Sequence, residues 1–170
     1  LAAAGAAFLS SASAGPSPGL WPLVTFVTVS FLLGLSPNTV RVAATGTTSF
    51  VAHIAAGLLF GAFWGGLVAA VSTILSQVQQ GAKFDRVVFN TAQRLLSVTL
   101  AIFAYQLLGG SVPPSYLLLD QVSTAEVQRD LFLFFCIALI YFAVNKATVA
   151  GASALSSGRP FREVWYLNFR

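Results

Sequence analysis

Four stretches of this sequence are more apolar and longer than the core elements of a soluble domain. The clearest three are residues 49–79, 87–108 and 131–151. Charged residues make up 8% of the chain and the mean hydropathy is +0.81, whereas a globular domain averages roughly 25% charged residues. A membrane-spanning helix needs about 20 apolar residues. The sequence therefore predicts a chain that lies in lipid and excludes a soluble enzyme.

The length of the chain limits how many such helices it can hold. Its 170 residues accommodate five or six membrane segments and short loops. The predicted fold is all-α, a polytopic integral membrane helical bundle of about five to six transmembrane segments, one of them short or half-membrane. We assign residues 1–158 to this bundle and residues 159–170 to an amphipathic juxtamembrane segment on the cytoplasmic side.

The first residues point to a longer natural chain. The sequence opens with Leu1 and contains no methionine, so we expect its natural start to be missing. Residues 1–14 resemble the apolar core of a signal peptide and equally the second half of a membrane helix. We favour the helix, because another apolar segment follows after a few residues.

Glycine, proline and capping residues divide the rest of the chain. Helices are predicted for residues 24–35 with a start near Gly19, for residues 49–60 and 62–79, which meet at Gly61, and for residues 84–108. The helix of about 12 residues is too short to cross a ~30 Å core. Asp85 is expected as an N-cap. Ser123 and Glu126 predict a capping box, and the helix that follows is expected to stop at residues 158–160.

The basic residues indicate an orientation. In a six-segment bundle, most of them fall on one side: Arg41, Lys83, Arg86, Arg159, Arg162 and Arg170. The opposite loops, 15–19 and 109–124, contain no Lys or Arg, and Arg129, flanked by Glu126 and Asp130, is the exception. Positive loops stay in the cytoplasm. We predict a multi-pass protein of the bacterial cytoplasmic (inner) membrane with both termini in the cytoplasm.

Small residues predict close helix packing around a histidine. Gly57, Gly61 and Gly65 form two small-xxx-small steps, which favour intramolecular packing or a dimer seam. His53 precedes Gly57 by one turn. A buried imidazole is usually a hydrogen-bonded core residue, and its functional alternatives are a ligand contact, a proton relay or an axial ligand to a porphyrin or chlorin.

Two predicted helices carry polar stripes. Asn90, Arg94 and Ser97 share one stripe with Gln93 beside it, and a second stripe contains Tyr141, Asn145 and Thr148. Such stripes predict interhelical hydrogen bonds or a cavity. Arg94 and Lys146 either extend to the cytoplasmic headgroups or bind an anionic ligand. The candidate ligand-binding residues are therefore His53, Asn90, Gln93, Arg94, Asn145 and Lys146.

No pattern of residues in the sequence indicates an enzyme. One His and the single Cys136 cannot form a metal-ligand cluster, and no nucleophile elbow, phosphate loop or dinucleotide fingerprint is present. We predict neither catalytic residues nor a bound metal, and no nucleic-acid partner. The sequence requires no cofactor, although a pigment or lipid contact would suit a subunit of a complex. The ligand, the oligomeric state and the role of His53 stay open.

The last residues predict a short amphipathic helix. Phe161, Trp165 and Phe169 recur every four residues, with Arg162 and Glu163 outside their stripe. This spacing is typical of a helix on the membrane surface, and we expect these aromatic residues to form an interface with a partner.

Three segments, 45–77, 84–110 and 141–169, together resemble a known family. They are similar to the polytopic N-terminal membrane-sensor module that precedes HD-GYP phosphohydrolase or GGDEF cyclase domains in bacterial cyclic-di-GMP signalling proteins. The shared features are a small-residue helix pair, a Phe89-Asn90-x-Ala92-Gln93 helix with a Gly-Gly turn, and an exit containing Asn145 and the ALSSGR run. The resemblance covers about residues 40–170. Lys146 departs from it, because a small or apolar residue is expected there.

The helix pair also resembles the substrate-binding S components of ECF vitamin transporters, which implies a comparable six-helix fold. Three hypotheses follow: a sensory or regulatory module that signals to a missing cytoplasmic output domain, an accessory structural subunit of a large membrane complex such as a photosynthetic or energy-converting one, and a small-molecule-binding transporter subunit. The expected partners are membrane lipids and either other membrane subunits or the output domain.

Overall fold

The computed structural model describes residues 17–35, 48–114, 117 and 123–169. Within these residues every regular element is a helix, which confirms the all-α prediction. The predictions for residues 1–16, Arg41, Arg170 and most of the connection before Ser49 lie outside the described residues. The helices are α2 (Leu20–Leu35), α3 (Ser49–Phe60), α4 (Ala62–Gln79), α5 (Phe84–Leu107), α6 (Thr124–Ser157) and α7 (Phe161–Phe169).

Three of these helices are long and apolar enough to cross a membrane. They are α4, α5 and α6, with 18, 24 and 34 residues. The two shorter apolar helices, α2 and α3, have 16 and 12 residues. At 1.5 Å per residue α3 is about 18 Å long and falls short of a ~30 Å hydrocarbon core. A helix of this length matches the short segment predicted from the sequence.

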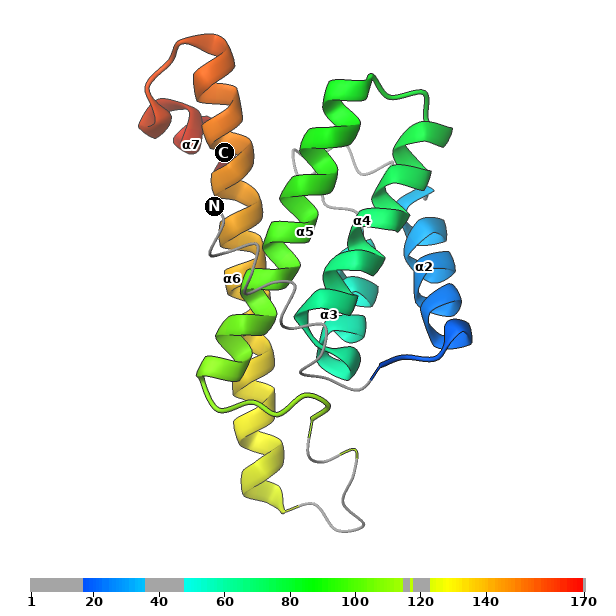
Figure 1. Ribbon diagram of the computed structural model, residues 1–170. Helices are drawn as coiled ribbons and strands as arrows, with labels where there is room; N and C mark the ends of the chain where they lie inside the picture. The colour runs from blue at the N-terminus through cyan, green and yellow to red at the C-terminus, as the bar shows by residue number, and fades with distance from the viewer. Residues whose placement is uncertain (1–16, 36–47, 115–116, 118–122, 170) are drawn as a thin grey trace.

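The helices pack side by side in an order that partly follows the sequence (Figure 1). α4 packs against both α2 and α5, α5 packs in turn against α6, and α3 contacts α2, α4 and α5. α7 folds back onto α6. The turn between α4 and α5 and the end of α6 lie at one end of the bundle (Figure 1). That end carries Lys83, Arg86, Arg159 and Arg162 and is called the basic end below.

The opposite end holds the start of α6. Ser123 caps this helix: its hydroxyl accepts the Glu126 N–H at 3.2 Å, and its own N–H donates to the Glu126 carboxylate at 3.0 Å. The predicted capping box is confirmed. Next to it, Arg129 pairs with the buried Asp130 at 3.3 Å. The stop after α6 is also confirmed, because Gly158 adopts a left-handed conformation with φ 67°.

The prediction of Asp85 as an N-cap is wrong. The residue before α5 is Lys83, whose backbone is extended with φ −62° and ψ 146°, and its side chain makes no capping bond. An N-cap has non-helical dihedrals, whereas Asp85 already lies in the first helical turn. There its carboxylate interacts favourably with the positive end of the helix dipole.

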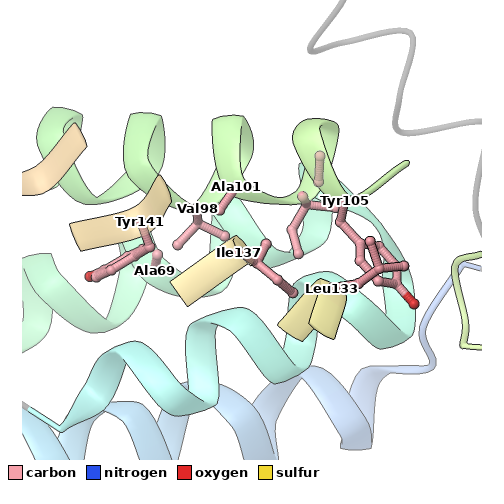
Figure 2. Close-up of a cluster of buried hydrophobic side chains, with 9 residues drawn as sticks. Ala69, Val98, Ala101, Tyr105, Leu133, Ile137 and Tyr141 are labelled. Carbon is pink, nitrogen blue, oxygen red and sulfur yellow. The ribbon is translucent and has the colours of Figure 1, made fainter. Parts of the chain in front are cut away.

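The apolar core lies between α5, α6 and the α3–α4 pair. Figure 2 shows Leu133, Ile137 and Tyr141 of α6 beside side chains of α5 and Ala69 of α4. Tyr105 stacks on Phe134 with ring centroids 6.2 Å apart. The core cluster consists of Ala62, Ala69, Val98, Ala101, Ile102, Tyr105, Leu133, Ile137 and Tyr141.

Another face of α6 is apolar and exposed. Leu131, Phe132, Phe135, Leu139 and Phe142 are between 40% and 64% exposed. Exposed apolar surface of this extent is costly in water and is favourable against acyl chains. This face agrees with a helix that lies partly against lipid.

Glycines allow α3 and α4 to touch through their backbones. A Cβ atom on Gly65 would lie 2.5 Å from Gly57 Cα, and one on Gly57 would lie 2.6 Å from Ile102 Cγ1. Gly57 therefore contacts α4 and α5 together. The close contact predicted for Gly61 is not present, because no atom lies within 4 Å of the position that a Cβ atom would take there. Its φ of 96° explains the glycine, since L side chains rarely adopt this conformation.

The close approach of α3 and α4 predicts different effects for two glycine substitutions. Gly65→Ala should destabilise the bundle by about 1–3 kcal/mol, because the new methyl group meets backbone that cannot move aside. Gly151→Ala is the matched control within α6, where no atom lies within 4 Å of the Cβ position. It should leave stability unchanged or raise it by up to about 1 kcal/mol.

The measurement is the thermal midpoint of helix loss by circular dichroism in a non-ionic detergent. Equal midpoints for the two variants would contradict the backbone contact between Gly57 and Gly65.

Candidate functional site

Hydrogen-bonding side chains join four helices in the half of the bundle nearer the basic end. We call this group the polar belt. Arg94 lies about 15 Å along α5 from its first residue, and Asn145 about 18 Å from the end of α6. The belt consists of Ser49 and His53 of α3, Ser72 and Gln77 of α4, Asn90, Gln93 and Arg94 of α5, and Asn145 of α6.

His53 connects α3 to α4. Its ring is fully buried, and Nε2 lies 2.9 Å from the Ser72 hydroxyl oxygen. Ser72 is buried as well, and its hydroxyl lies 3.3 Å from the Ala69 carbonyl. No described residue forms a hydrogen bond with His53 Nδ1. Buried polar atoms are normally hydrogen-bonded, so this nitrogen is an exception within an otherwise connected group.

Arg94 connects α5 to the start of α3. Its Nη1 donates to the Ser49 hydroxyl at 2.9 Å, and Ser49 is the first residue of α3. Phe50, the next residue, stacks on Tyr141 of α6 with centroids 5.6 Å apart. The first two residues of α3 therefore contact α5 and α6.

The two predicted polar stripes meet between α5 and α6. Gln93 Nε2 donates to the Asn145 backbone carbonyl at 3.0 Å and also to the Asn145 side-chain oxygen. Asn90 turns to α4 instead, where its Nδ2 donates to Gln77 Oε1 at 3.0 Å. Ser97 and Thr148 bond to carbonyls of their own helices. Among the residues of the two predicted stripes and the Gln93 beside them, Asn90, Gln93 and Arg94 thus donate hydrogen bonds to other helices.

Lys146 is the candidate residue that the structure keeps apart from the belt. It is half-buried on α6, and it forms no ion pair with any described residue. Its neighbour Asn145 faces α5 instead, because consecutive helical residues point about 100° apart.

The C-terminal helix docks on α6 near the basic end. Val164 and Trp165 pack against Ala150 and Ala154 of α6. Phe161 lies 5.5 Å from the Trp165 ring and is about half exposed. The predicted aromatic stripe thus contributes Trp165 to the contact, and the side chain of Phe169 lies outside the described part of the chain.

The exposed side of α7 carries charge. Arg159 pairs with Glu163 at 3.6 Å, and the Arg162 guanidinium lies 5.8 Å from the centre of the Tyr166 ring. Both contacts are at the surface, where they stabilise little. The docked side of α7 is therefore its apolar side.

Sequence reasoning missed Ser49, Ser72, Gln77 and Val164. The serines resemble the small residues that favour helix contacts, and only the assembled bundle makes them partners of Arg94 and His53. One signal was present: Ser72 and Ser76 continue the small-residue face of Gly65 and Ala69 at helical spacing.

The belt has the chemistry of a binding or positioning site. Within the described residues, no group of three or more His, Cys, Asp or Glu side chains could hold a metal ion. Amides, hydroxyls, an imidazole and a guanidinium can together bind a polar or anionic group.

Comparison of the chain with known protein families, with curated proteins and with solved structures finds no match.

The contact between α5 and α6 can be measured by a double-mutant cycle. Gln93→Ala and Asn145→Ala should show a coupling free energy of about 0.6–2 kcal/mol, the range for interhelical hydrogen bonds in membranes. Asn90→Ala with Asn145→Ala is the control pair, because Asn90 bonds to α4 instead.

The readout is the free energy of unfolding in mixed micelles for the wild type, each single variant and each double variant. Coupling as large in the control pair as in the test pair would argue against a specific Gln93–Asn145 bond.

Proposed function

We propose that this chain is a sensory or regulatory module of the bacterial cytoplasmic membrane, which performs no chemistry itself and acts through protein contacts. The proposal rests on the length and the contacts of helix α6. This helix runs without interruption for 34 residues, about 51 Å, and touches in turn the apolar core, the polar belt and α7.

The position of the contacts along α6 supports this role. Leu133, Ile137 and Tyr141 lie in the core, Asn145 lies in the belt, and Ala150 and Ala154 hold α7. A helix is stiff over this length. A displacement of α6 at the belt therefore reaches the α7 contact about one and a half to two and a half turns away, as in rigid-element switching.

The family resemblance supports the same reading. In the sensor modules that the sequence resembles, the exit segment leads to a cytoplasmic output domain. Here the corresponding residues are the end of α6 and α7, so we propose that α7 couples the bundle to such a domain.

We further propose a bundle of five to six transmembrane segments whose basic end faces the cytoplasm, as the distribution of Lys and Arg favours. This orientation predicts opposite labelling at the two ends of the bundle. In a Cys136→Ala background, a Ser111→Cys substitution should react with a membrane-impermeant maleimide from outside intact cells, and Ser157→Cys should react only after lysis. Both serines are exposed. Labelling of both from the same side would overturn the proposed topology.

The coupling role predicts that the α6–α7 contact controls an output. With a GGDEF cyclase domain joined after residue 170, Val164→Ser should change cyclase activity in membrane vesicles by about fivefold or more, which corresponds to a coupling of about 1 kcal/mol. Leu167→Ser is the matched control, because Leu167 is 54% exposed on the same helix and should leave activity unchanged.

Two results would favour the alternatives. If Val164→Ser and Leu167→Ser behave alike and the gene stops after Arg170, an accessory subunit of a membrane complex fits better. If the isolated chain binds a vitamin-like molecule tightly and α7 has no influence on an output, an S-component-like transporter subunit fits better.

A further inference from the structure

Lys146 is a cation on the long helix α6 without a counter-ion among the described residues. It is half-buried and forms no ion pair with any of them. The carboxylates of the described residues are held elsewhere, in two ion pairs, in the capping box of α6 and in the first turn of α5: Asp130, Glu163, Glu126 and Asp85. An unpaired charge beside hydrocarbon is costly. An anion from outside the bundle would therefore stabilise Lys146.

The position of Lys146 along α6 matches the boundary between hydrocarbon and lipid headgroups. No charged residue lies between Asp130 and Lys146, and about 24 Å of helix separates the two. The hydrocarbon core of a bilayer is ~30 Å thick. When Asp130 and its partner Arg129 lie at one boundary, the Lys146 Cα atom is therefore a few ångströms inside the other. The flexible stem of a lysine can bring its ammonium group from there to the level of the phosphates.

An exposed apolar stripe leads from Lys146 toward the middle of the bilayer. Phe142, Leu139 and Phe135 precede Lys146 by one, two and three turns on the same face of α6, and all three are exposed. We call these three residues the α6 stripe. From Lys146 to Phe135 the helix is about 16 Å long, which is half of a ~30 Å hydrocarbon core and thus the depth of one leaflet. A cation at the head of such a stripe matches the charge and the length of a phospholipid.

A second copy of the chain fits the α6 stripe less well than a lipid does. Two copies with the same orientation in the membrane would pair with their α6 helices parallel, so their Lys146 side chains would face each other. Like charges repel, and the repulsion is stronger where water is excluded. On the other side of Lys146, α7 docks on Ala150 and Ala154, one and two turns further along α6. The lysine therefore lies between the stripe and α7, where a negatively charged occupant is favoured.

We infer that Lys146 and the α6 stripe form a binding site for one anionic phospholipid in the leaflet at the basic end of the bundle. The ammonium group binds the headgroup phosphate, and an acyl chain lies along Phe142, Leu139 and Phe135. An anionic lipid is favoured over a zwitterionic one, because its headgroup carries no cation that competes with the lysine. The inference rests on the proposed placement of α6 in a membrane, and it names a class of ligand for the proposed module.

The chain contains two lysines, Lys83 and Lys146, so the site can be observed directly. The full chain, labelled with ¹³C at the lysine Cε and purified in a non-ionic detergent, gives two NMR signals, which Lys83→Arg assigns. Phosphatidylglycerol, phosphatidylcholine and sn-glycerol 3-phosphate, a headgroup without acyl chains, are added separately. We expect phosphatidylglycerol to shift the Lys146 signal saturably, phosphatidylcholine to bind about fivefold or more weakly, and glycerol 3-phosphate to leave the signal unchanged.

Lys83 is the matched control at the same end of the bundle. It is exposed, but the residues one and two turns further along its face of α5 are Val87 and Asn90, and Asn90 bonds to α4, so no open apolar stripe follows it. Lys146→Gln should weaken phosphatidylglycerol binding by about fivefold or more, and Lys83→Gln should bind like the wild type. Native mass spectrometry counts the bound lipid. If Lys146→Gln does not fold, the two lysine signals of the wild type still decide.

Several results would refute the lipid site. They are no response of Lys146 to phosphatidylglycerol, equal responses of Lys83 and Lys146, equal affinity for phosphatidylcholine, and a shift caused by glycerol 3-phosphate alone, which would indicate a water-soluble anion. A shift of the Lys146 signal that grows with protein concentration in the absence of lipid would indicate a second copy of the chain instead. Because this experiment uses no output domain, its failure is distinguishable from failure of the coupling between α6 and α7.

Discussion

The contact between Gly57 and Gly65 is the constraint on which the polar half of the bundle depends. Without side chains at these positions, α3 and α4 approach until their backbones touch, and Ile102 of α5 fits against Gly57 from the other side. The turn at Gly61, with φ 96°, reverses the chain within one residue. This geometry brings His53 to Ser72 and Ser49 to Arg94. A larger residue at Gly65 would push α3 and α4 apart and would therefore disturb both pairs.

The bundle is divided along its length into an apolar and a polar half. Leu133, Ile137 and Tyr105 fill the end opposite the basic residues, whereas amides, hydroxyls and Arg94 join the helices nearer the basic end. In a bilayer, polar side chains are costly unless they bond within the protein. Their concentration in one half agrees with a role in binding or positioning. Packing alone would be served as well by apolar side chains.

Helix α6 connects the apolar half and the polar half of the bundle to α7. Its core face is continuous from Leu133 to Tyr141, and Asn145 then receives both bonds from Gln93. Beyond the belt, small residues at Ala150 and Ala154 leave room for Val164 and Trp165.

The sequence by itself determined the all-α class, the helices long and apolar enough to cross a membrane, and the points where most of the helices begin and end. Long apolar runs, the Ser123–Glu126 capping box, Gly61 and Gly158 are local signals, because each depends on residues within one or two turns. It also indicated that Asn90, Gln93 and Asn145 face other helices. Only the tertiary structure decided the partners: Gln93 with Asn145, Asn90 with Gln77, and Arg94 with Ser49. These pairs are separated by 13 to 52 positions, and helical periodicity specifies a face and not the neighbour it meets.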